Sequence, residues 1–239
     1  MSNDGRRVSV AGTPIDYNVT RSDDATEPRI DVGIHAITVV LPTGSDIDPD
    51  TLVTENGRWV LDKKRKYERY REEAPDREFA VGETFPFLGD PYTVAVEAID
   101  EHAVADGELR LAASKVERTS IREELERLYK LEARRHFEDR AEHYRAEMGV
   151  EYDRIELRNQ RTRWGSCSPN RTLAFNWRLM MAPTEVVDYI VVHELAHLRE
   201  KNHTTQFWEI VGEHDLEYTQ HAEWLEANSS QLIFSERDL

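Results

Sequence analysis

The residues best suited to chemistry lie in one short segment, Val191 to Leu198. His193 and His197 are four positions apart, and Glu194 follows the first histidine. On a helix the two imidazoles project from one face and can share a metal ion, while the glutamate reaches a water bound to that ion. This is the HExxH pattern, in which zinc takes both imidazoles and the glutamate acts as general base.

The sequence around this pattern argues against a chance match. The stretch from Val186 to Leu198 is apolar on nearly every side, which is typical of a buried helix. Burying two histidines and a glutamate without partners would cost several kcal/mol. A metal ion and its water would satisfy all three side chains. The alternative is a pair of hydrogen-bonded core histidines beside an ion-paired glutamate.

A catalytic zinc usually has three protein ligands and one open position. We favour His203 as the third ligand over Glu217, which lies twenty residues after His197. On an unbroken helix His203 would be rotated by about 240° from His197 and would face away. The helix must therefore end first, and Asn202 in a left-handed conformation can turn the chain back. Three apolar residues of the next helix are expected behind the site: Phe207, Trp208 and Val211.

The expected chemistry is hydrolysis. Zinc lowers the pKa of its bound water from 15.7 to roughly 7 and so supplies a nucleophile near neutral pH. Glu194 would take the proton during attack and return it to the leaving group. Because imidazole also binds cobalt, nickel and iron, the residues do not define the metal.

A second segment precedes the helix and reads Arg163-Trp164-Gly165-Ser166-Cys167, followed later by Asn176-Trp177-Arg178-Leu179. We expect Arg163, Asn176 and Trp177 to contact substrate. An edge strand at Leu173–Leu179 would hold an extended peptide by main-chain hydrogen bonds. Cys167 is the only cysteine, which excludes an internal disulfide and a multi-cysteine zinc site. Packing is therefore favoured over a ligand or nucleophile role for its thiol.

Taken in order, these two motifs, the HExxH helix, Asn202-His203 and Phe207-Trp208 resemble the YgjP-like metallopeptidase family. The resemblance is strongest from residue 155 to 212 and weaker over the N-terminal half. It implies a zincin-like catalytic region with zinc on His193, His197 and His203 and with Glu194 as catalytic base. It also implies kinship with SprT-like proteases, some of which act on proteins attached to DNA, although no DNA-binding tail or extra zinc module is evident here.

The elements that must position these residues predict an α+β protein. Residues 1–115 are expected to form a small antiparallel β-rich region with one basic helix, and residues 116–239 a zincin-like catalytic domain. Turns at Asn56-Gly57, Gly89-Asp90-Pro91 and Asp106-Gly107 separate short β-rich runs, which include RWVL and REFAVG. In the second region, Ser120 and Glu123 have capping-box spacing and Gly149 can end the helix that follows. No internal repeat is evident.

The basic helix is predicted from Trp59 to Glu73, and its residues 63–71 include six basic side chains and one acidic. We expect a solvated face, with Trp59, Val60, Tyr67 and Tyr70 directed inward. This is the one basic patch that could contact an anion such as a nucleotide or a nucleic-acid backbone.

The overall charge argues against broad nucleic-acid or anionic-membrane binding. Asp and Glu number 47 against 31 Lys and Arg, a formal net charge of −16. Only six of the basic residues are lysines, and such an acidic, arginine-rich surface is typical of halophilic proteins, in which net charge maintains solubility. The sequence has no long apolar run and no signal-peptide pattern, so a cytoplasmic location is expected.

Two other functions remain open. A metal-activated water could attack a phosphoanhydride, as in a nucleoside triphosphate pyrophosphatase or phosphohydrolase. Arg158, Arg161, Arg163 and Arg171 could clamp phosphates, although no glycine-rich phosphate loop is present. The other alternative is a non-catalytic, metal-stabilised binding module, which would have a fourth protein ligand.

Overall fold

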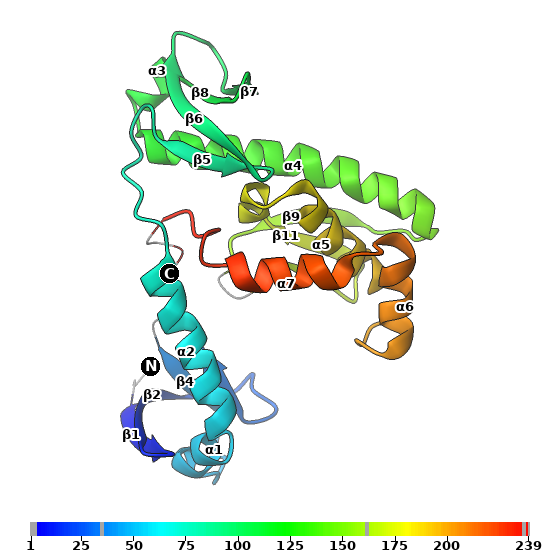
Figure 1. Cartoon of the computed structure of the whole chain (residues 1–239). Coiled ribbons are helices and arrows are strands. Elements are labelled where there is room, and N and C mark those ends of the chain that lie inside the picture. Colours follow the sequence, from blue (N-terminus) through cyan, green and yellow to red (C-terminus); the bar gives the residue numbers. More distant parts are fainter. Residues whose placement is uncertain (1–3, 34–35, 161–162, 236–237, 239) are drawn as a thin grey trace. The chain divides into compact units, whose positions relative to one another are not determined.

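The computed structural model describes residues 4–33, 36–160, 163–235 and 238 (Figure 1). The chain divides into two compact units, one ending at Ala74 and one spanning Pro75–Asp238. None of the helices in the described ranges combines the length and the apolar composition that a bilayer span requires.

The first unit is a four-stranded mixed sheet covered by helices. Its strands are β1 (Asp4–Val10), β2 (Thr13–Ser22), β3 (Arg29–Val32) and β4 (Ile37–Pro42), in the order β1-β2-β4-β3. Strands β2 and β4 are parallel, and the other two pairs are antiparallel. Alternating residues of β2, including Ile15, Tyr17 and Val19, join the core, which fits the two-residue period of a strand with one buried face.

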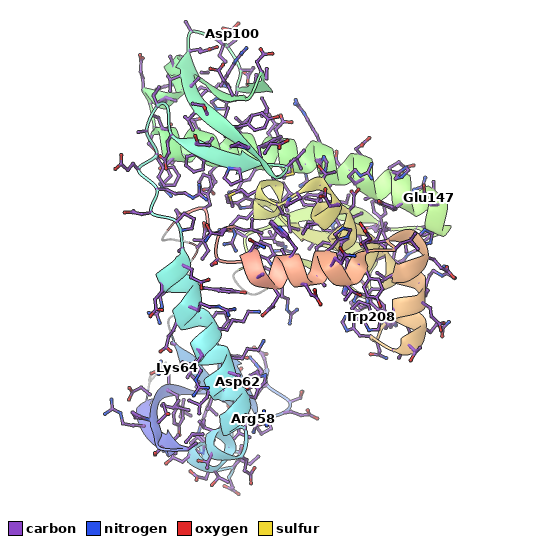
Figure 2. All side chains as sticks on the ribbon, viewed as in Figure 1. Arg58, Asp62, Lys64, Asp100, Glu147 and Trp208 are labelled. Carbon is purple, nitrogen blue, oxygen red and sulfur yellow. The ribbon has the colours of Figure 1, made fainter. Side chains whose placement is uncertain are left out.

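The helices of this unit are α1 (Pro49–Glu55), capped by the Asp48 carboxylate, and α2 (Gly57–Glu73). Helix α2 is the expected basic helix, and Val60, Tyr67 and Tyr70 are buried. Trp59 is 45% exposed, so its expected inward orientation was wrong. Figure 2 shows Arg58, Asp62 and Lys64 along this helix. Ion pairs at i,i+4 spacing, such as Lys64–Glu68, compensate part of its positive charge.

The second unit begins with a sheet of the same design. Its strands β5 (Thr84–Phe87), β6 (Asp90–Glu97), β7 (Ala103–Ala105) and β8 (Glu108–Ala112) have the order β5-β6-β8-β7. Strands β6 and β8 are parallel and the outer pairs are antiparallel, as in the first sheet. Helices again follow, here α3 (Ala113–Val116) and α4 (Ile121–Met148).

The first hairpin of each sheet turns in the same way. Ala11 and Gly12 have φ angles of 50° and 82°, and Leu88 and Gly89 have 49° and 89°. Two consecutive residues with positive φ form the tight turn that matches the twist of an antiparallel pair. The strand order, orientations and first turn therefore repeat, although the sequence analysis found no internal repeat.

The remaining elements build the region around the HExxH segment. Strands β9 (Arg154–Arg158), β10 (Gly165–Cys167) and β11 (Thr172–Asn176) form a sheet in the order β10-β11-β9. A short 3-10 helix, η1 (Trp177–Met181), follows β11. It leads to the buried helix α5 (Thr184–Ala196), and α6 (Thr205–His214) and α7 (Tyr218–Asn228) come after it.

Helix α4 supports both β11 and α5. The rings of Phe137 on α4 and Phe175 on β11 stack at a centroid distance of 4.6 Å. Arg140 on α4 forms a two-pronged ion pair with Asp188 on α5, with N–O distances of 2.6 and 2.7 Å. Both ends of α4 are as predicted: Ser120 Oγ accepts from the Glu123 amide, and Gly149 has a φ of 62°.

The structure corrects several expectations for the N-terminal half. The β-rich region is two mixed sheets rather than one antiparallel sheet, because each inserts its fourth strand beside its second. The compact units divide after Ala74 instead of residue 115, since β5–β8 pack with α4. RWVL lies in α2 rather than in a strand, and REFAVG, residues 77–82, precedes β5.

Candidate metal centre

Helix α5 presents two histidines at its C-terminal end. His193 lies in its last turn and His197 is the residue that caps it. The chain then tightens, because the Leu198 and Arg199 amides bond the carbonyls three residues back. The expected end of the helix before His203 is confirmed. The expected device was wrong, since the non-glycine residues described with positive φ do not include Asn202.

The turn after α5 returns His203 to the other two histidines. One nitrogen from each of His193, His197 and His203 can be chosen so that all three atoms lie within 4.8 Å of one another. The Nε2 atoms of His203 and His193 are 3.0 Å apart. Glu217, the alternative third ligand, precedes α7 and is not in this group. The structure thus brings together the three imidazoles that the sequence analysis selected.

The state of these imidazoles suits a divalent metal. Burial, together with the neighbouring His197 and His203, lowers the pKa of His193 to about 3, so this ring is neutral at pH 7. Burial also lowers the pKa of His197. Its Nδ1 lies 3.2 Å from the Glu200 carbonyl oxygen, which can only accept, so Nδ1–H donates and Nε2 keeps a free lone pair.

Unsatisfied polar atoms give a second test of the fit. Among the described residues, Glu194 Oε2 is buried without a hydrogen-bond partner, and this side chain lies beside the three histidines. A buried polar atom without a partner is costly unless a ligand, a water or an ion satisfies its group. Three imidazoles converging beside a carboxyl group are a donor set that zinc and similar ions prefer.

Glu194 lies beside the histidines and under strand β10. Its side chain is buried, and burial raises its pKa to about 8, with Arg163 acting in the opposite direction. A Cβ added to Gly165 would come within 2.5 Å of Glu194 Oε1. Glycine at this position therefore allows the backbone of β10 to lie directly against the carboxyl group.

Strand β10 is the edge strand nearest the site. It pairs antiparallel with β11 on one side only, since the strand order is β10-β11-β9. Strand β11 is central, and residues 177–181 are a 3-10 helix. The expected edge strand at Leu173–Leu179 is therefore wrong, and the edge strand beside Glu194 is Gly165–Cys167.

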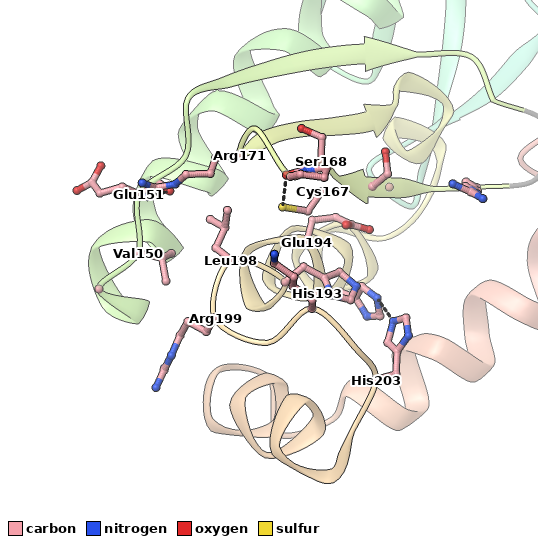
Figure 3. Close-up of a pocket in the computed structure, with 17 residues that line it drawn as sticks. Val150, Glu151, Cys167, Ser168, Arg171, His193, Glu194, Leu198, Arg199 and His203 are labelled. Atoms are coloured by element: carbon pink, nitrogen blue, oxygen red, sulfur yellow. Dashed lines mark hydrogen bonds between the residues drawn. The ribbon is translucent and has the colours of Figure 1, made fainter. Parts of the chain in front are cut away.

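A cleft with a volume of about 890 Å³ contains the site (Figure 3). Its lining includes Gly165, Glu194 and the three histidines, and it includes Arg163, which was expected to contact substrate. Asn176 and Trp177, the other two expected substrate contacts, do not line it and are 2% and 1% exposed. Because both side chains are buried outside the cleft, they are placed to support the fold around it rather than to contact substrate directly.

Asn176 and Arg178 support the chain that enters β10. Asn176 Nδ2 donates to the carbonyls of Gln160 and Arg163 at 2.7 and 3.3 Å, and the Arg178 guanidinium donates to Gln160 at 2.8 Å. The same guanidinium lies 5.5 Å from the centre of the Trp164 ring. Trp177 instead packs against Tyr129 and Phe234.

Cys167 lines the cleft but does not join the histidine group. Burial and the nearby Glu194 raise the pKa of its thiol to about 11, so it is protonated at neutral pH. Its Sγ atom lies 3.8 Å from the Ser168 carbonyl oxygen. A protonated, partly buried thiol favours the packing role over a nucleophile.

The four arginines considered as a phosphate clamp are not all at the site. Arg163 and Arg171 line the cleft. Arg158 pairs with Glu156 on β9 and is not in the lining, and Arg161 falls outside the described residues.

Aromatic side chains of α6 pack behind the histidines, as expected. The Phe207 ring lies 4.5 Å from that of His197, and Trp208 stacks on His203 at 5.7 Å. Val211 is buried in the same core. Thr204 caps α6 by accepting from the Phe207 amide, which fixes the helix directly after His203.

The chain was compared with protein-family models, curated proteins and solved structures. The model of the YgjP-like metallopeptidase domain matches residues 26–228. Among solved structures, the chain is similar to the crystal structure of the metallopeptidase zymogen of Pyrococcus abyssi abylysin, with 22% identity and a TM-score of 0.34 over 41% of this chain and 99% of that chain. No curated protein matches it. Because the family model spans most of the sequence, including α5 and His203, the chain belongs to the YgjP-like metallopeptidase family.

Proposed function

We propose that this protein is a zinc-dependent peptidase in which Glu194 is the general base. The observation that carries the proposal is the convergence of three imidazoles next to one buried carboxyl group in a cleft. His193, His197 and His203 would hold the ion. Zinc in such a site supplies a Lewis acid that lowers the pKa of water and polarises a carbonyl oxygen.

The role of Glu194 follows from its position and its protonation. It is buried at the cleft beside the histidines, and its pKa of about 8 lies close to neutral pH. Without metal, such a carboxyl group is largely protonated at neutral pH. A divalent cation held by the three imidazoles would favour the carboxylate form, which could then take a proton from attacking water and return it to the leaving amine. Glu194→Gln keeps the shape of the side chain but removes this proton transfer.

The edge of β10 is suited to hold an extended peptide. One side of Gly165–Cys167 pairs with β11, and on its other side no strand of the described part of the chain pairs with it, so that side could accept a peptide strand. Gly165 brings that edge into contact with Glu194. A peptide that added to β10 would therefore have its main chain next to the general base, which supports peptide hydrolysis over a small-molecule reaction.

The residues of the cleft also bear on two other functions, nucleoside triphosphate hydrolysis and non-catalytic metal-stabilised binding. Arg163 and Arg171 in the cleft favour phosphate binding and keep nucleoside triphosphate hydrolysis as the second candidate. A non-catalytic binding module would need a fourth protein ligand, whereas the histidine group in the described part of the chain has three members.

The test begins with metal analysis of protein purified without added ions. The protein is then assayed with zinc, manganese or magnesium against denatured protein, a peptide library and nucleoside triphosphates. We expect peptide cleavage with zinc and its loss in Glu194→Gln with the zinc content unchanged. Normal cleavage by Glu194→Gln contradicts the mechanism, and release of pyrophosphate or phosphate without peptide cleavage favours the nucleotide alternative.

A further inference from the structure

The cleft carries positive charge that the proposed mechanism does not use. Arg171, Arg199 and Lys201 line it and are exposed. They come from two separate segments, the turn before β11 and the turn after α5. In Figure 3, Arg171 and Arg199 lie toward Val150, on the side of Glu194 away from His203. We refer to Arg171, Arg199 and Lys201 as the cationic end of the cleft.

These cations differ from most others in the second unit. Within the described residues, none of Arg171, Arg199 and Lys201 forms an ion pair with a carboxylate. Most other basic side chains of this unit do form such pairs: Arg110, Lys115, Arg122, Arg127, Lys130, Arg134, Arg135, Arg140, Arg145, Arg154 and Arg158. In a chain with a net charge of −16, uncompensated cations gathered in one cleft are unusual.

The carboxylates of the described residues that line the cleft form no ion pair with Arg171, Arg199 or Lys201. Glu151 is the carboxylate in the lining besides Glu194, and it pairs with Arg145 at 2.6 Å. Arg171 donates to the main-chain carbonyl of Glu151, which orients the guanidinium and leaves its charge uncompensated. A carboxylate entering the cleft would therefore meet arginine and lysine donors without first breaking an ion pair.

We propose that the cationic end of the cleft selects peptides that carry aspartate or glutamate side chains near the bond to be cleaved. This inference rests on the proposed peptidase function and names its substrate class. A peptide added to β10 would extend from Gly165 past Cys167 toward Arg171, so acidic side chains there would reach the cations. Positive walls in a cleft concentrate anionic ligands, even when the rest of the surface is acidic.

The test measures binding without turnover. The zinc-loaded Glu194→Gln protein is titrated into labelled, C-terminally amidated peptides of equal length in which alternate residues are Val and the others are all Glu, all Gln or all Lys. Fluorescence anisotropy gives each Kd at low and high salt. We expect the Glu peptide to bind most tightly and the Lys peptide least tightly, with the preference weakening as salt rises.

Charge reversal assigns the preference to the cleft. In the same Glu194→Gln background, Arg199→Glu should weaken binding of the Glu peptide by about fivefold, because it removes one exposed ion pair and adds a like-charge repulsion. It should leave binding of the Gln peptide nearly unchanged. Arg199→Lys should restore most of the preference. Arg118→Glu makes the same charge change at an exposed residue of the second unit that does not line the cleft, and it should have no effect.

The possible results distinguish failure of the proposed preference for acidic peptides from failure of the proposed peptidase function. Equal binding of the Glu and Gln peptides, or a preference that survives Arg199→Glu, overturns the inference and leaves the peptidase proposal standing. Failure of every peptide to bind the folded, zinc-loaded protein contradicts the peptidase proposal as well. A preference that persists after zinc removal supports arginine and lysine, rather than the ion, as its source.

Discussion

The two four-stranded sheets of this molecule share one topology but support different structures. Both have a tight first hairpin, a parallel pair in the middle and helices directly afterwards. In the first unit those helices are α1 and α2, and the latter exposes a basic surface. In the second unit the long helix α4 packs against the elements that carry the candidate metal centre. Strand order alone therefore does not determine function. The two units differ in what the helix after the sheet packs against.

The largest expected contrast is between two glycines, one in each unit. A Cβ at Gly165 would lie 2.5 Å from Glu194 Oε1, and a Cβ at Gly57 would lie 2.2 Å from Val10 Cγ1. We expect Gly165→Ala to lower kcat/KM by about 100-fold, because a small displacement of a catalytic group has effects of this size. Zinc content should be unchanged.

Gly57→Ala serves as the matched control. It should destabilise the first unit by about 1–3 kcal/mol through overpacking and leave kcat/KM of the remaining folded protein unchanged. Kinetic assays together with chemical denaturation of both variants make this comparison. Equal losses of activity in the two variants would remove the functional distinction between the units.

The second contrast is between ion pairs. Arg140 and Asp188 connect α4 to α5 and are mostly buried, with side chains 24% and 16% exposed. Arg7 and Asp16 form an exposed pair on the first sheet. Asp188→Asn should cost about 3 kcal/mol, because it leaves a partly buried guanidinium without its carboxylate. Asp16→Asn should cost less than about 1 kcal/mol, as for other exposed pairs. Urea denaturation measures both, and similar costs would contradict the proposed support of α5 by α4.

The third prediction concerns acid and the second unit. Burial lowers the pKa of His136, and also that of His193 and His197. For each histidine the unfolded chain binds a proton more readily than the folded chain, so stability is lost as the pH falls below about 6.5. For metal-free protein we expect His193, with its pKa of about 3, to contribute a loss that approaches 1.4 kcal/mol for each pH unit below about 6.5, and His136 and His197 to add to it in the same direction.

His136→Gln isolates one of these contributions. Its metal-free form should lose less stability than the parent protein between neutral pH and about pH 5.5, by roughly 1 kcal/mol. Denaturation curves at several pH values provide the measurement. An unchanged pH dependence in this variant would show that His136 is not held neutral by burial.

The smallest expected effect is on helix α2. Lys64 and Glu68 form an exposed i,i+4 pair, so Lys64→Ala should change the free energy of unfolding by no more than about 0.5 kcal/mol. It should leave peptide cleavage unchanged, because the proposed catalytic residues all belong to the second unit. A clear loss of cleavage in Lys64→Ala would show that the first unit takes part in the function.

The sequence predicted the site better than the sheets around it. The HExxH spacing, the need for the helix to end before His203, and the apolar residues of α6 each follow from local geometry. Similarly, the Ser120 and Gly149 caps define α4 because capping depends on adjacent residues. These features needed no knowledge of which distant segments pair.

Features that depend on distant contacts were missed. The mixed strand order of the two sheets arises because β4 and β8 each insert between two earlier strands, which alternation of residues cannot reveal. Strand β10 is only three residues long, and Gly165 is explained by its contact with Glu194, which lies 29 positions later. Asn176 and Trp177 were expected to contact substrate, but both are buried in the folded chain. The cationic end of the cleft likewise joins segments that are separate in sequence.

Calorimetric titration of zinc into the metal-free protein tests the central claim most directly. The parent protein, Glu194→Gln and Glu217→Gln should each bind one ion with similar affinity. His203→Ala should bind at least about 100-fold more weakly, because one of three ligands is lost. Unchanged zinc affinity in His203→Ala, or loss of binding in Glu217→Gln, would contradict a site made of His193, His197 and His203.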